Sequence, residues 1–119
     1  MCELLSPVGN MDVLMSSINA GCDAVYLSGI NFSARSFAGN FNNEEMIEAI
    51  KICHLYGVKV YAAVNTIIYE TEVDRFIKYI EFLYRNNIDA VIMQDIGMID
   101  LVRKVFPLLD IHASTQSNI

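Results

Sequence analysis

The sequence is poor in basic residues, and it lacks close cysteine pairs and long apolar runs. Eight Lys and Arg stand against fourteen Asp and Glu, a formal net charge of −6, and no basic run occurs. A surface that follows nucleic-acid phosphates needs such a run, so we expect the chain alone to bind nucleic acid poorly. No apolar stretch reaches the roughly 18 residues that span a bilayer, and the first three residues are acidic rather than basic as in a signal peptide. We expect a cytoplasmic protein without a membrane span.

The cysteines are three, Cys2, Cys22 and Cys53, and they lie far apart. A zinc or iron–sulfur site brings several thiolates or imidazoles together and is usually announced by close pairs such as CxxC. The sequence therefore predicts reduced, partly buried thiols, and neither a metal nor another cofactor in this chain.

Hydrophobic residues make up 54% of the chain and charged residues 18%, which excludes a disordered polypeptide. The 119 residues suffice for one compact domain at most. Short apolar runs predict strands near residues 2–6, 23–28, 58–65, 89–94 and 110–114. Between them apolar residues recur with helical spacing, as at Met46, Ala49, Ile50 and Cys53. Strand–helix units that repeat about every 30 residues predict a parallel sheet with helices outside it.

Two parallel α/β architectures compete. A doubly wound sheet often binds its ligand through a glycine-rich first turn, but neither GxGxxG nor GxxxxGK[ST] occurs. A (β/α)8 barrel places polar groups at the carboxyl end of each strand, and each predicted strand ends in one, at Ser6, Ser28, Asn65, Gln94 and Ser114. The barrel is favoured.

A complete barrel takes about 250 residues, so residues 1–119 are predicted to be the N-terminal half of an incomplete barrel, about four βα units and a fifth strand. The first and fifth strands then keep unpaired edges, which predicts self-association.

Gln94 and Asp95 are the candidate catalytic residues, because a carboxylate at a strand end can act as a general base or bind a cation. Asp95 also stands where an aspartate caps the following helix, and the cap is the commoner role. No GxSxG, HExxH or matched Cys–His pair points to a nucleophile.

The candidate substrate-binding residues follow other strand ends. Ser6 and Gly9 belong to a turn that either binds an anion at a helix N-terminus or only connects two elements. Arg35 lies in a long loop where it suits a carboxylate or phosphate, or is a surface group. The remaining candidates are Tyr26, which is either core or pocket-facing, Asn65, and the polar stripe His112, Ser114 and Gln116 on one face of the last strand.

The sequence also resembles peptidase family U32, the collagenase-like proteases, over essentially its whole length. The matching segments are 3–10, 20–27, 32–35, 40–41, 57–61, 65–66, 89–95 and 112–116, which include ELLSPVGN, AGCDAVYL, DAVIMQD and HASTQ. Val8 and Ser28 depart from the residues expected there, Ala and Gly.

The resemblance implies a TIM-like barrel and two kinds of activity. Some members are named proteases, and others support oxygen-independent hydroxylation of transfer RNA, ribosomal RNA or ubiquinone. The resemblance also implies that a hydroxylase of this family holds a [4Fe–4S] cluster on four cysteines, which would lie beyond this chain. None of Cys2, Cys22 and Cys53 matches those four cysteines. On the chemistry of the strand ends we favour the hydroxylase. A true peptidase and a non-catalytic barrel module for assembly are the alternatives, and this part alone is expected to be inactive.

Overall fold

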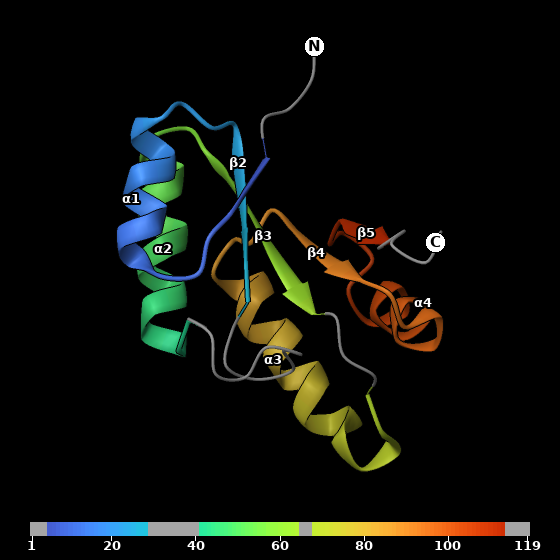
Figure 1. Cartoon of the computed structure of the whole chain (residues 1–119). Coiled ribbons are helices and arrows are strands. Elements are labelled where there is room, and N and C mark those ends of the chain that lie inside the picture. The colour runs from blue at the N-terminus through green and yellow to red at the C-terminus, as the bar shows by residue number, and fades with distance from the viewer. Residues whose placement is uncertain (1–4, 29–40, 65–67, 114–119) are drawn as a thin grey trace, which may run out of the picture.

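The computed structural model describes residues 5–28, 41–64 and 68–113, and its centre is one parallel sheet (Figure 1). Five strands pair in chain order, each parallel to the next. They are β1 (Leu5–Pro7), β2 (Ala24–Leu27), β3 (Lys59–Val64), β4 (Ala90–Met93) and β5 (Ile111–Ala113). Pairing in chain order is the arrangement of a barrel, and the α/β fold with five parallel strands is confirmed.

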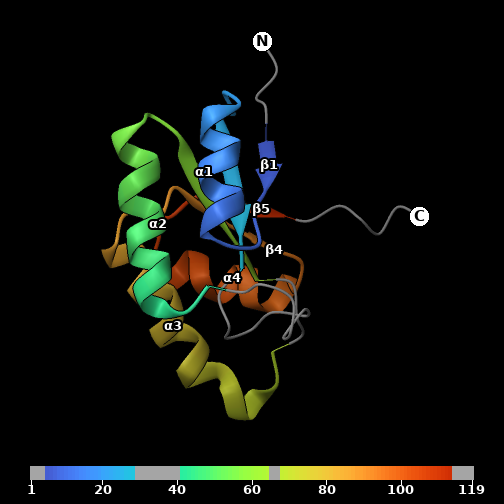
Figure 2. The ribbon, with the colours of Figure 1, turned by 60° about the vertical axis from the view of Figure 1, so that its left-hand side comes forward.

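A helix follows each of the first four strands. These are α1 (Met11–Asn19), α2 (Asn43–Leu55), α3 (Val73–Arg85), which the 3-10 turn η1 (Glu70–Glu72) precedes, and α4 (Ile96–Val105). Figures 1 and 2 both show α1 and α2 side by side along the sheet. In the part of the chain that the structure describes, no helix combines the length and the apolar character that a membrane crossing needs.

The helix ends are set by local hydrogen bonds. Asn42 accepts from the Glu45 amide at 2.8 Å, and the Glu45 carboxylate accepts from the Asn42 amide at 3.0 Å, which is a complete capping box for α2. Gly21 and Gly57 turn the chain into β2 and β3 with φ of +87° and +74°, angles that glycine adopts without steric cost. Pro7 lies in edge strand β1, where the lack of an amide hydrogen costs least.

The sheet has an outer face that the helices cover. Val25, Val60 and Leu27 are buried there, and they pack with helix residues such as Phe76 and Ile80 in one apolar cluster. Burial of apolar surface between the outer face of the sheet and the helices stabilises the fold.

The opposite face, here called the inner face, carries the alternate residues of the same strands. Its residues are Ala24, Tyr26, Tyr61, Ala63, Ala90, Ile92 and His112. Ala24, Tyr61 and Ala90 form a second, smaller buried cluster, against which Tyr26 and Ile92 pack. A sheet that is apolar on both faces is typical of a parallel sheet whose two faces are both covered, as in a barrel.

The two outermost strands predict self-association of the chain when it is produced by itself. β1 and β5 each have one neighbour among the described strands, and unpaired strand edges attract other strands. We expect light scattering at tens of micromolar to give a mass above the 13.4 kDa of one chain. A clean monomer at that concentration would contradict the prediction.

Candidate functional site

Asp95 lies at the carboxyl end of β4 and connects two segments there. Its Oδ1 accepts from the Met98 amide at 3.3 Å, which caps α4, and its Oδ2 accepts from the Ile68 amide at 3.5 Å. The carboxylate is half-buried and has further lone pairs that can accept a hydrogen bond. The capping role of Asp95 is therefore observed, and it leaves room for a second role. Gln94 is exposed beside it.

The inner face holds two of the predicted residues, Tyr26 and His112. The His112 ring packs edge-on against the Tyr61 ring, with centroids 5.0 Å apart and an interplanar angle of 69°. Tyr61 is buried and was not predicted from the sequence. Its place on β3, opposite Tyr26 on β2, depends on the strand register, which a single sequence does not reveal.

A small polar hollow opens beside this aromatic pair, towards the amino ends of the strands. Its volume is about 150 Å³, and its lining residues are Lys59, Tyr61, Asp89, Ala90, Asp110 and His112. Lys59 begins β3, and Asp89 and Asp110 directly precede β4 and β5. His112 thus borders the amino-end half of the inner face, whereas Gln94 and Asp95 lie at the carboxyl ends.

Ser6 faces away from the inner face, and Gly9 follows the carboxyl end of β1. The Ser6 hydroxyl is hydrogen-bonded to the Ser17 hydroxyl of α1 at 2.9 Å, so Ser6 points towards the helices. Gly9 is half-buried in the turn from β1 to α1, directly before the capping residue Asn10. Four predicted residues lie outside the described residues: Arg35, Asn65, Ser114 and Gln116.

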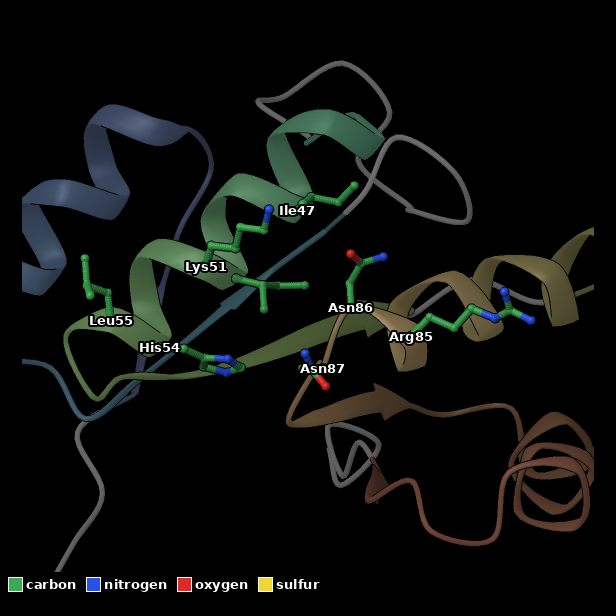
Figure 3. Close-up of a pocket in the computed structure, with 8 residues that line it drawn as sticks. Ile47, Lys51, His54, Leu55, Arg85, Asn86 and Asn87 are labelled. Atoms are coloured by element: carbon green, nitrogen blue, oxygen red, sulfur yellow. The ribbon is translucent and has the colours of Figure 1, made fainter.

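A larger groove, of about 380 Å³, lies between α2 and the end of α3. Figure 3 shows Ile47, Lys51 and His54 of α2 on one side of the groove and Asn86 and Asn87, which follow α3, on the other. His54 and Arg85 are already paired, with Asp89 at 2.7 Å and Glu81 at 2.7 Å. Both helices also end here, and the carbonyl end of a helix repels anions. The groove is consequently a weak anion site, and we place the candidate site at the carboxyl-end edge and inner face of the sheet.

The described residues do not fit an iron–sulfur cluster. Among residues 5–28, 41–64 and 68–113, no three His, Cys, Asp or Glu side chains are grouped so that they could hold a metal ion. Burial raises the pKa of the Cys53 thiol to about 12, with smaller contributions from Cys22 and Asp89, and burial also raises the pKa of Cys22. A cluster is held by several converging thiolates, and these two buried cysteines belong to no such group among the described residues.

Substitutions of Asp95 can distinguish its role as a helix cap from a role in the reaction. Asn caps helices as well as Asp but has one acceptor oxygen, so Asp95→Asn should keep the bond from the Met98 amide and lose only the longer one from the Ile68 amide. It should therefore cost less stability than Asp95→Ala, which loses both bonds and should cost about 1 kcal/mol or more. If the charge serves the reaction, Asp95→Asn in the complete protein should lower kcat/KM by about 100-fold. Urea unfolding and activity, measured on both variants, check this. Full activity in Asp95→Asn would leave Asp95 as a cap only.

The raised thiol pKa values predict slow alkylation of the folded chain. At about pH 8 the Cys53 thiolate is scarce in the native state, so iodoacetamide should leave Cys22 and Cys53 unlabelled until urea is added, as counted by mass spectrometry. Because the folded pKa of Cys53 exceeds that of an exposed thiol, its contribution to stability should be full below about pH 8.5 and fall as the pH rises further. Rapid native labelling of Cys53 would contradict the prediction.

Comparison with known proteins identifies relatives of two kinds. The chain is 38% identical over its whole length to an uncharacterized protease, MJ0090, of Methanocaldococcus jannaschii, of which it covers 29%. It is 33% identical to tRNA hydroxylation protein P1 of Bacillus subtilis and 37% identical to the 23S rRNA 5-hydroxycytidine C2501 synthase of Escherichia coli. Each of these two alignments covers 98% of the chain, and they cover 28% and 17% of the relatives. The chain therefore spans less than a third of the length of these relatives.

The fold and the family agree. The solved structure of the U32 peptidase Mk0906 superposes with a TM-score of 0.74 at 10% identity, over 95% of this chain and 47% of that one. The family model for peptidase family U32 matches residues 9–119. The predicted resemblance is confirmed, and the chain belongs to peptidase family U32.

Proposed function

We propose that this chain is the N-terminal part of an enzyme that hydroxylates a base of transfer or ribosomal RNA in the cytoplasm. The observation that carries the proposal is the identity of 33% and 37%, over 98% of the chain, with two proteins named for RNA hydroxylation. Because those relatives are named for different RNAs, the substrate is proposed at the level of RNA.

The described side chains support a binding role better than a hydrolytic one. Gln94 and Asp95 offer hydrogen-bond donors and acceptors at the carboxyl-end edge. On the inner face the half-buried Tyr26 and the exposed His112, whose ring packs on the buried Tyr61, offer ring surface. Enzymes that modify a base hold it by hydrogen bonds to its edge and by contact with its faces. A peptidase would need an activated nucleophile or a metal-bound water, and no described residues pair in that way.

The oxidation chemistry is proposed to come from outside these 119 residues. Cys22 and Cys53 are buried and belong to no group of metal-binding side chains among the described residues, so a [4Fe–4S] cluster of the complete protein would need other cysteines. The role left to this part of the chain is to bind the base and orient it.

Peptidase activity is the second candidate, because the Methanocaldococcus relative is named a protease. A hydrolytic reaction would draw its nucleophile or metal from the part of the complete protein beyond these residues. Hydroxylation of a quinone ring instead of an RNA base would make the same demands on the inner face, so the experiment measures quinones as well as nucleosides.

The proposal is tested by deleting the gene for the complete protein. Nucleosides from purified tRNA and rRNA should then lack one hydroxylated base, as seen by mass spectrometry, and the intact gene should restore it. Quinones from the same cells serve as the parallel measurement. Unchanged nucleosides together with a lost quinone hydroxylation, or with cleavage of peptides by the purified protein, would contradict the RNA proposal.

A further inference from the structure

We propose that Tyr69 stacks on a base of the RNA substrate at the rim of the site, an inference that rests on the proposed function. Tyr69 follows Ile68, whose amide is bonded to the Asp95 carboxylate. That bond places Tyr69 beside the carboxyl end of β4, at the edge where Gln94 and Asp95 lie.

The Tyr69 ring is presented to solvent from a fixed backbone. Tyr69 is 67% exposed, and Ile96 on the other side of Asp95 is 81% exposed. The Tyr69 amide donates to the Glu72 carboxylate at 3.1 Å, and the Glu72 amide donates to the Tyr69 carbonyl at 2.8 Å. The two hydrogen bonds to Glu72 and the neighbouring Ile68–Asp95 bond therefore fix the backbone of Tyr69.

Charge favours contact with a base rather than with phosphates. The chain has a net charge of −6 and no basic run. Glu70 and Glu72 lie one and three residues after Tyr69, and Glu72 is paired with Arg75 at 3.2 Å. Phosphate groups are repelled from such a surface. An aromatic ring still binds a base by stacking, which does not need positive charge. A base extended away from its backbone is the part of an RNA that this edge can accept.

The competing explanation is that another part of the complete protein covers Tyr69. In that case the ring would contribute to stability and not to RNA binding. The two possibilities differ in what happens when the ring is removed.

The test uses the complete protein and a fluorescent single-stranded oligoribonucleotide that contains the hydroxylated position, without the modification. We expect Tyr69→Ala to weaken binding about tenfold by fluorescence anisotropy, to the same extent at low and high salt, with unchanged thermal melting. Tyr69→Phe keeps the ring and should bind like the wild type. Tyr56→Ala is the matched control, because Tyr56 is 59% exposed but ends α2 at the amino ends of the strands.

Each other outcome overturns the proposal in a recognisable way. If Tyr69→Ala binds and hydroxylates RNA like the wild type, stacking by Tyr69 is wrong while the proposed function stands. If Tyr69→Ala weakens binding but also lowers the melting temperature of the protein, the ring packs on the rest of the protein. If the wild type neither binds nor hydroxylates RNA, the proposed function and this inference both fail.

Discussion

Parallel pairing of β1 to β5 in chain order is the constraint on which the rest of the structure depends. Because neighbouring strands run the same way, every carboxyl end lies at one edge, and the residues that follow the strands gather there. The same pairing aligns side chains in rows, so that Val25 and Val60 face the helices while Tyr26 and Tyr61 share the inner face. The helix-covered face provides stability, and the proposed binding residues lie on the inner face and at the carboxyl-end edge.

Asp89 shows how the amino ends of the strands are secured. Its carboxylate accepts from the Val60 amide and from the His54 ring, both at 2.7 Å, and its own amide donates to the Val60 carbonyl at 3.0 Å. One residue thus joins α2, β3 and the start of β4. Charge-assisted hydrogen bonds of this kind stabilise more than neutral ones, so Asp89 stabilises the amino ends of the strands. The exposed residues Gln94, Tyr69 and Ile96 lie at the carboxyl ends.

The sequence was sufficient to predict the fold because strand and helix patterns alternate regularly. The order of the elements and the parallel sheet follow from local patterns. The site was harder to predict. Tyr61 came to lie against His112 through the register of three strands, and Ser6 turned towards Ser17 because strand side chains alternate between faces. Tyr69 carries no motif, and its exposure depends on a capping bond to Glu72 and on Asp95, far away in the sequence.

The central claim is that these residues bind and orient the substrate while the oxidising group is held outside them. The most direct measurement is iron and acid-labile sulfide on the complete protein purified without oxygen, beside the 119-residue chain. We expect roughly four of each per complete chain and none on the shorter chain. Stoichiometric iron on the shorter chain, or none on the complete protein under conditions where a known cluster protein keeps its own, would contradict the claim.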